Sequence, residues 1–213
     1  MQKKMLDIVN KLSELYKSPK CELNFNSNYE LLVVVILSAQ CTDKRVNQIA
    51  PLLFEKAKTP YEMVKLGEQN VAEIIKPCGF FNNKAKNIIK ASKDIIDRFN
   101  GEVPSDEKDL VSLAGVGRKT ASVVQSIAFK IPAIAVDTHV FRLSHRLGIT
   151  SKKTPDKVQD DLQVKIDKKY WIDFHYSLVL HGRYICKARK PECTQCGLKD
   201  YCKFVKEKNK IRK

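Results

Sequence analysis

Apolar residues recur at helical spacing along almost the whole chain. Over residues 83–99 they fall on one face of a 3.6-residue period, and Asn100-Gly101 follows as a stop signal. Residues 28–40 are apolar on every side, which predicts a helix that is buried all round. No stretch shows the regular alternation of a half-buried strand. The pattern therefore predicts an all-α fold.

Start and stop signals place the remaining helices. Thr59-Pro60 and Thr154-Pro155 each put a capping threonine before a proline at the first helical position. Residues 70–73 have the form of a capping box, and Pro77 ends the short helix that would follow. The other expected helical ranges are 1–16, 44–58, 138–147, 155–167 and 171–182.

Residues 113–117 hold two glycines separated by one valine, and a helix is predicted to begin at Arg118. Upstream, Ser105 is expected to cap a short helix with acidic residues in its first turn. Together they predict a helix–hairpin–helix over about 105–128, whose amides at a helix N-terminus attract phosphate and hold DNA backbone without reading bases. Such a turn can also simply connect two helices.

Two residues near this hairpin suggest chemistry. Lys119 lies in the first turn of the second helix, where the dipole disfavours a cation, so it is either a solvated surface lysine or an amine activated as a nucleophile. Lowering a lysine pKa from ~10.4 to ~8 requires about 3 kcal/mol. A dipole supplies ~0.3–1 kcal/mol. The remainder has to come from desolvation or a neighbouring cation such as Arg118. Asp137 follows an apolar run and reads as a helix N-cap, a position that does not exclude catalysis.

The composition indicates a polyanionic partner. Lys and Arg number 39 against 24 Asp and Glu, a net charge of +15 that would suit a nucleic-acid, ribosomal or membrane-surface protein. The longest apolar run, residues 31–37, is too short to span a bilayer, and the N-terminus does not read as a signal peptide. Seven cysteines without a secretion signal favour a reducing cytosol.

Four of the cysteines form a strong metal-binding pattern, Cys186-x6-Cys193-x2-Cys196-x5-Cys202. Four thiolates suit tetrahedral zinc or an iron–sulfur cluster, and the chemistry of the spacing leaves both open. Basic residues inside the first loop, Lys187, Arg189 and Lys190, are well placed to meet phosphates, while Lys206 to Lys213 also read as a solvated charged tail. Cys21, Cys41 and Cys78 lie outside the pattern and are expected to pack as small apolar groups.

The sequence LAGVGRKTA, followed 18 residues after Lys119 by the aspartate of AVDTHVFR, resembles the helix–hairpin–helix DNA glycosylases. Within them the chain resembles the endonuclease III family, from LSAQCTDKRVN at Leu37 to the last cysteine. The resemblance implies a bifunctional glycosylase and abasic-site lyase for oxidised pyrimidines. It makes Lys119 the Schiff-base nucleophile and Asp137 the catalytic carboxylate.

The resemblance also implies a two-lobed architecture. Residues 20–131 would form a six-helix barrel, and residues 1–19 with 132–213 a discontinuous terminal domain. Lys119 and Asp137 would face each other across the cleft between them. The cysteine spacing matches the single 4Fe–4S cluster of the family, so iron is expected in the loop 186–202, in a structural role.

Two turns are expected to enter the duplex. In the family, the glutamine that matches Gln40 fills the space left by the extruded nucleotide. Phe80 or Phe81 would be a wedge that unstacks the bases, unless both pack into the core. The family commonly has an aliphatic residue at the position of Phe80, so the lesion and opposite-base preferences stay open. Further DNA contacts are expected from Gly115, Gly117 and Arg118.

The expected partner is double-stranded DNA that contains damaged pyrimidines or abasic sites, bound by a cytoplasmic, nucleoid-associated monomer with no membrane attachment. The sequence leaves two alternative functions open. A monofunctional adenine-mismatch glycosylase is disfavoured by Lys119, which that enzyme lacks, and by the absence of a long C-terminal recognition domain. A non-enzymatic helix–hairpin–helix protein stapled by zinc would also explain the motif and the four cysteines.

Overall fold

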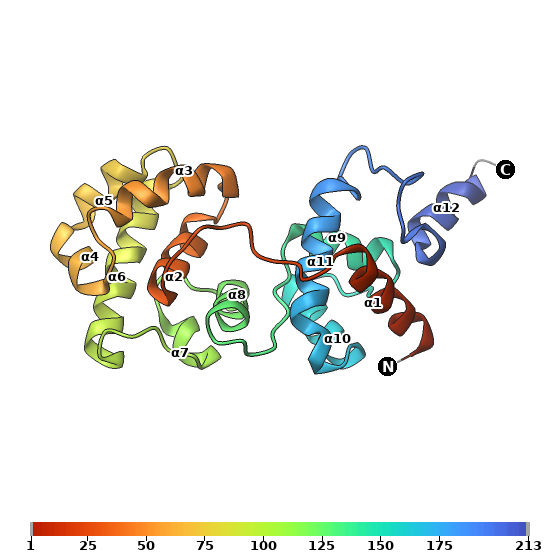
Figure 1. The fold of residues 1–213 in the computed structure, drawn as a ribbon, viewed down its shortest axis with the longest axis horizontal. Helices are drawn as coiled ribbons and strands as arrows, with labels where there is room; N and C mark the ends of the chain where they lie inside the picture. The colour runs from red at the N-terminus through yellow and green to blue at the C-terminus, as the bar shows by residue number, and fades with distance from the viewer. Residues whose placement is uncertain (1, 212–213) are drawn as a thin grey trace. The chain divides into compact units, whose positions relative to one another are not determined.

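The computed structural model describes residues 2–211, with the side chains of residues 2–207. These residues form twelve α-helices, two short 3-10 helices (Lys168–Tyr170 and Lys199–Tyr201) and no strand, which confirms the all-α prediction (Figure 1). The chain divides into two compact units. The middle unit is Glu22–Ile131, and the terminal unit combines Met1–Cys21 with Pro132–Lys213. Among the described helices none is long and apolar enough to cross a membrane.

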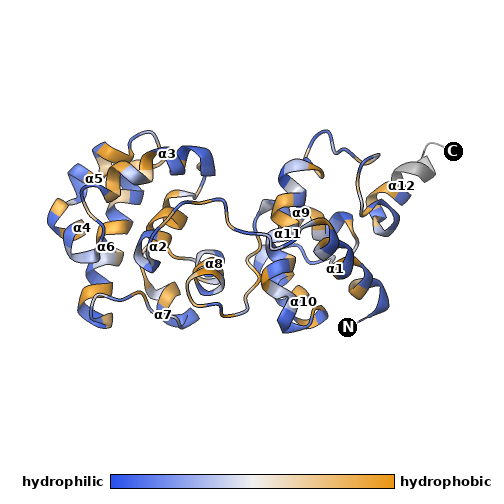
Figure 2. Ribbon diagram, in the orientation of Figure 1, coloured by the Kyte–Doolittle hydropathy of each residue, from blue (hydrophilic) through white to orange (hydrophobic). Residues whose placement is uncertain are grey.

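The middle unit is built around helix α2. Every residue from Tyr29 to Leu37 is buried. Most residues of α2 are apolar, as the hydropathy colouring shows (Figure 2). Ser27 caps it by accepting a hydrogen bond from the Glu30 amide at 3.1 Å. Helices α3, α6 and α8 pack against it. The helices of this unit are α2 (Asn28–Leu37), α3 (Asp43–Phe54), α4 (Pro60–Leu66), α5 (Glu68–Ile75), α6 (Phe81–Phe99), α7 (Glu107–Ser112) and α8 (Arg118–Ala128).

Local capping chemistry decides where several helices begin. Thr59 and Glu62 form the reciprocal capping box at the start of α4. The capping box predicted at Asn70 is wrong, because α5 already begins at Glu68, after Gly67 with its positive φ of 81°. Asn70 lies inside that helix, and its side-chain amide donates to the Leu66 carbonyl at 2.7 Å.

Helix α2 also ends earlier than the predicted limit of residue 40. It stops at Leu37, and Ser38 donates its hydroxyl hydrogen to the Val35 carbonyl at 2.8 Å. Two residues later Gln40 has a φ of 52°, which no α-helix contains. The next helix, predicted over 44–58, also ends early, at Phe54.

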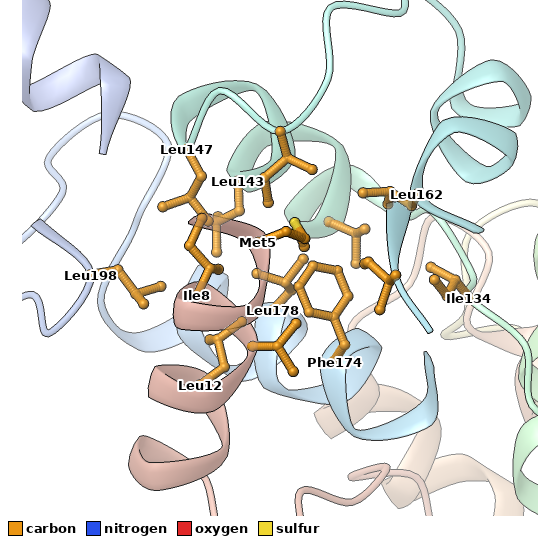
Figure 3. Close-up of a cluster of buried hydrophobic side chains, with 14 of the residues drawn as sticks. Met5, Ile8, Leu12, Ile134, Leu143, Leu147, Leu162, Phe174, Leu178 and Leu198 are labelled. Carbon is orange, nitrogen blue, oxygen red and sulfur yellow. The ribbon is translucent and has the colours of Figure 1, made fainter. Parts of the chain in front are cut away.

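The terminal unit has a core of its own. Ile8 and Leu12 pack with Leu143, Phe174 and Leu178 from two other helices (Figure 3). A C-terminal helix was not predicted, because residues 206–213 read as a charged tail. It forms because Phe204 and Val205 pack against this core. The helices of this unit are α1 (Lys3–Leu15), α9 (Thr138–Arg146), α10 (Pro155–Lys165), α11 (Trp171–Tyr184) and α12 (Lys203–Ile211).

Candidate active site and cysteine loop

The hairpin between α7 and α8 is held in place by buried apolar residues. Leu113 and Val116 are buried, while Gly115 and Gly117 are exposed. Gly115 has a φ of 78°, and a Cβ on it would lie 3.0 Å from the Cβ of Asn87, so only glycine fits without strain. Gly117 has an ordinary φ of −91° and open space where a Cβ would be. It caps α8 and offers no side chain to the first amides of that helix, which leaves them suited to a phosphate.

The helix before the hairpin is capped differently from the prediction. Asp106, not Ser105, is the N-cap of α7, and its carboxylate accepts from the Lys108 amide at 2.8 Å. Aspartate caps as well as serine does. The Ser105 carbonyl instead accepts from the Gln125 side-chain amide at 3.0 Å, which ties the chain before α7 to α8.

Lys119 projects from the first turn of α8 and is exposed. Its neighbour Arg118 is half-buried, and the guanidinium Nε lies 3.3 Å from a carboxylate oxygen of Glu107. This ion pair joins the two helices of the motif, so Arg118 has a structural partner inside the protein. The hairpin therefore presents one exposed amine beside the open amides of α8.

Two further turns in this unit carry Gln40 and Phe80. Both residues are exposed, Phe80 to 65%, and both adopt left-handed backbone conformations with φ of 52° and 57°. A left-handed non-glycine residue costs free energy, and such residues collect at functional sites. The two turns lie side by side, because a Cβ on Gly79 would be 3.7 Å from the Gln40 carbonyl oxygen. Phe80 therefore does not pack into the core, and Phe81 is only partly buried.

In the terminal unit, Asp137 is the N-cap of α9, as predicted. Its carboxylate accepts a hydrogen bond from the Val140 amide at 2.7 Å, and the residue is half-buried. The preceding residues 133–136 are all buried, which fixes the backbone that carries the carboxylate. The carboxylate is thus held at a helix N-terminus by buried chain on one side and a capping bond on the other.

Two arginines of α9, which sequence reasoning missed, hold the cysteine loop in place. Arg142 donates to the carbonyls of Gly182 at 2.9 Å and Cys186 at 3.1 Å. Arg146 donates to the carbonyls of Lys187 at 2.9 Å and Ala188 at 2.8 Å. Their spacing of four residues, which puts both on one helix face, was the available signal. His139 lies beside Arg142 and against Gly182, so it helps to shape this corner.

The four cysteines of the loop lie close enough to influence one another electrostatically. Arg146 donates to the Cys186 sulfur at 3.2 Å, and His181 Nε2 lies 3.3 Å from the Cys196 sulfur. Burial raises the pKa of the Cys196 and Cys202 thiols, so a bound metal has to displace their protons.

His181 is set up to donate to a thiolate. Burial lowers its pKa to about 4, so the ring is neutral at physiological pH. Burial also raises the pKa of Tyr16 to about 12, so its hydroxyl keeps its proton and lies 2.8 Å from His181 Nδ1. If Tyr16 donates to Nδ1, the ring proton is on Nε2 and points to the Cys196 sulfur.

No group of three His, Cys, Asp or Glu side chains that could hold a single metal ion occurs in the part of the chain that is described. The donor set nevertheless fits an iron–sulfur cluster, which takes four thiolates. A cationic Arg146 and a neutral N–H donor at His181 would stabilise the negative charge of those thiolates.

The predicted phosphate-binding residues of the loop, Lys187, Arg189 and Lys190, are all exposed. Lys187 forms an ion pair with Glu192 at 2.5 Å, so part of its charge is already matched. A surface hollow of about 590 Å³ in the terminal unit is lined by residues that include Lys4, Ile149 and Lys165, and by neither predicted catalytic residue. Its location therefore does not identify the chemical site.

The regions described above, the hairpin and the cysteine loop, lie in segments that match known protein families. Residues 33–168 match the HhH-GPD superfamily of base excision DNA repair proteins, and residues 186–202 match the iron–sulfur binding domain of endonuclease III. Endonuclease III of Rickettsia conorii is 47% identical over 92% of this chain and 96% of its own length. That of Escherichia coli is 45% identical over 96% of this chain and 97% of its own. The chain belongs to the endonuclease III family.

Solved structures of the family agree. A non-covalent endonuclease III–DNA complex matches with a TM-score of 0.93 and 41% identity, covering 100% of both chains. An endonuclease III trapped as a covalent intermediate with DNA matches with a TM-score of 0.92 and 40% identity, covering 98% of this chain and 100% of that one. As a member of the endonuclease III family, the protein is a DNA-binding base-excision glycosylase with abasic-site lyase activity, and it carries one 4Fe–4S cluster. The two alternatives, a mismatch glycosylase and a zinc-stapled binding module, are not favoured.

Proposed function

We propose that this protein removes oxidised pyrimidines from duplex DNA and cuts the strand at the resulting abasic site, using Lys119 and Asp137. The observation that carries the proposal is the exposed amine of Lys119 at the start of α8, whose N-cap Gly117 has no side chain, directly after a hairpin whose amides suit a phosphate. The protein would act as a cytoplasmic monomer on chromosomal DNA.

The chemistry begins with the Lys119 amine. The neutral amine attacks C1′ of the damaged nucleoside as the bond from C1′ to the base breaks, and the base leaves with the bonding electrons and takes up a proton. Opening of the sugar ring gives an imine between Lys119 and C1′. Loss of a proton from C2′ then expels the 3′ phosphate, which cuts the strand by β-elimination.

The amine has to be neutral for this attack. Lys119 is exposed in the protein, so its amine is open to a bound duplex.

Asp137 would supply the complementary charge. A carboxylate held at the start of α9 can stabilise the positive charge that develops on the sugar as the base leaves, and it can move protons to and from the amine. Its capping bond uses one oxygen, Oδ1, and the second oxygen can serve the reaction.

Gln40 and Phe80 would enter the duplex. Both are exposed on adjoining turns and are held in left-handed conformations. An aromatic wedge unstacks neighbouring bases at a cost of a few kcal/mol, which is least at damaged pairs. Gln40 would fill the space that the extruded nucleotide leaves.

Phosphate contacts would come from two places. The amides after Gly115 and Gly117, with Arg118, would hold the backbone near the lesion. Lys187, Arg189 and Lys190 would meet phosphates from the cysteine loop, which the cluster shapes. Cys186, Cys193, Cys196 and Cys202 would be the cluster ligands, and the cluster would act as a structural centre that orders this loop.

Borohydride trapping tests the proposal. Reduction of the imine joins the wild-type protein covalently to duplexes that contain thymine glycol or an abasic site. Lys119→Ala should abolish this product, and Lys90→Ala, which changes another exposed lysine of the same unit, should leave it unchanged. Normal trapping by Lys119→Ala would refute the assignment, and trapping only on a duplex with mismatched adenine would refute the substrate class.

A further inference from the structure

Cys41 and Cys78 belong to the two adjoining turns of the middle unit, although they are 37 positions apart in the chain. The residues next to them are in contact, because a Cβ on Gly79 would be 3.7 Å from the Gln40 carbonyl oxygen, and the two thiols influence each other directly. Cys78 is completely buried, while Cys41 is partly exposed. One thiol of the pair is therefore accessible to small reagents in solution, and the other can be reached only through its partner.

Two cationic side chains, Lys84 and Arg45, lie near this pair. The buried ammonium of Lys84 donates to the Leu37 carbonyl at 2.8 Å and interacts electrostatically with both thiols. Arg45 also lowers the pKa of Cys78, although burial outweighs both cations and raises that pKa to about 11. Positive charge near a thiol favours the thiolate, which is the form that reacts with oxidants.

We propose that Cys41 and Cys78 form an oxidation site that reacts with hydroperoxides and closes a reversible disulfide between the two turns. Neither residue belongs to the machinery of base removal or to the cluster loop. The chemical pairing stands on the geometry of the two thiols alone. Its effect on repair rests on the proposed function, because the turns it joins are those that carry Gln40 and Phe80.

The reaction balances with the hydroperoxide as the only oxidant. The sulfur of Cys41 attacks one peroxide oxygen, the O–O bond breaks, and the products are a sulfenic acid on Cys41 and water or an alcohol. The sulfur of Cys78 then attacks the Cys41 sulfur, and the hydroxyl of the sulfenic acid leaves as water with the proton of Cys78. Two thiols are oxidised by two electrons in total, and the peroxide is reduced by two.

A disulfide here would restrain both turns. Cys41 follows Gln40 directly, and Cys78 stands two residues before Phe80. A disulfide brings the sulfurs to ~2.05 Å and restricts the dihedral angle between them. Gln40 and Phe80 would then lose the freedom to move apart when a duplex is wedged open, so the oxidised protein is expected to process lesions more slowly.

Peptide mapping of the holoenzyme tests the pairing. The protein is treated with hydrogen peroxide, its remaining thiols are alkylated, and it is digested with trypsin. Cys41 lies in the fragment 21–44 and Cys78 in the fragment 66–84, and the expected product is the two joined with the loss of two hydrogens. Because Cys21 shares the first fragment, Cys21→Ser should leave the product intact, while Cys41→Ser and Cys78→Ala should each remove it.

The functional effect is read separately, with the visible absorbance of the cluster followed to show that peroxide has left it intact. Single-turnover excision by the oxidised wild type should fall on the order of tenfold, as small misplacements of positioning groups can cause. A thiol reductant should restore it, and Cys78→Ala should not respond to peroxide.

Several results would overturn the proposal: over-oxidation of Cys41 without the joined peptide, the same loss in Cys78→Ala, or undiminished excision by fully cross-linked protein. A reduced wild type without excision activity would instead count against the proposed function, and it would leave the mapping result valid. Far-ultraviolet circular dichroism of each variant shows whether it has folded.

Discussion

The carboxylate of Asp137 accepts the amide hydrogen of Val140 at 2.7 Å, so the group proposed for catalysis is also the cap of helix α9. A cap holds its carboxylate in one position relative to the helix, with the positive end of the helix dipole beside it. Stability and catalysis then depend on the same side chain but on different atoms and charges, and suitable substitutions can separate them.

Asp137→Asn is expected to separate the two roles. Asparagine caps a helix as well as aspartate does, so the free energy of unfolding should change by only a few tenths of a kcal/mol, and DNA should still bind. Excision should become slow because the negative charge is lost. Asp137→Ala should lose both, with an additional destabilisation of about 0.5–2 kcal/mol. Thermal denaturation and single-turnover kinetics measure the two effects, and unimpaired turnover of Asp137→Asn would refute the catalytic role.

The two hairpin glycines are expected to respond differently to alanine. Gly115→Ala should destabilise the protein by about 1–2 kcal/mol, because φ is 78° and the new Cβ would approach Asn87 to 3.0 Å. Gly117→Ala should leave stability nearly unchanged, since its φ is ordinary and the space is open. It should still weaken DNA binding, because the added methyl group keeps a phosphate from the amides of α8.

Denaturant unfolding and fluorescence anisotropy with duplex DNA distinguish the two glycine variants. Equal losses of stability in both would show that the turn, and not its approach to DNA, determines the need for glycine at Gly117. Undiminished DNA binding by Gly117→Ala would remove the hairpin amides from the proposed interface.

Helix positions followed well from the sequence where packing and capping agree. Residues 31–37 are all apolar, and helix α2 is buried from Tyr29 to Leu37. Asn100 and Gly101 both adopt left-handed conformations after α6, as their residue types suggest. Thr59 forms its capping box with Glu62. In these places short-range chemistry and long-range burial favour the same structure.

The errors arise where tertiary contacts decide between local alternatives or supply packing that the local sequence does not show. Ser105 and Asp106 are both good caps, and a tertiary bond from Gln125 to the Ser105 carbonyl accompanies the choice of Asp106. Helix α12 depends on Phe204 and Val205 reaching a core that is built from distant segments. The approach of Cys41 to Cys78 likewise depends on tertiary packing, so spacing along the chain gave no sign of it.

Some residues of the candidate site could be predicted from the sequence, and others could not. The motif around Lys119 and the four-cysteine pattern are local, so both were visible in the sequence. The support from Arg142 and Arg146 was missed, because each bonds to carbonyl groups about forty residues away, and a carbonyl group has no signature in the sequence.

The cysteine loop should contribute to the salt dependence of DNA binding. Each neutralised phosphate changes the logarithm of affinity by ~0.9 per logarithmic unit of salt. Arg189→Ala should therefore reduce the slope by about 0.9, if Arg189 meets one phosphate. Lys187→Ala should reduce it less, because Lys187 is already paired with Glu192. Anisotropy titrations over a range of salt concentrations give the slopes, and an unchanged slope for Arg189→Ala would remove this residue from the interface.

Removal of iron is expected to loosen the terminal unit and spare the middle one. Leu198 and Cys202 belong to the terminal core, and Cys186 and Cys196 pack against it, so a loop without its cluster would withdraw apolar contacts from α1 and α9. No residue of Glu22–Ile131 belongs to that core cluster. After anaerobic chelation, amide hydrogen exchange should rise in 186–202 and in the helices of the terminal unit, while α2 and α6 keep their protection. The cysteine variant Cys196→Ser should behave like the chelated protein, and Cys21→Ser, outside the loop, like the wild type. Equal loosening of both units would show that the cluster stabilises the whole protein, and no loosening at all would show that the loop folds without it.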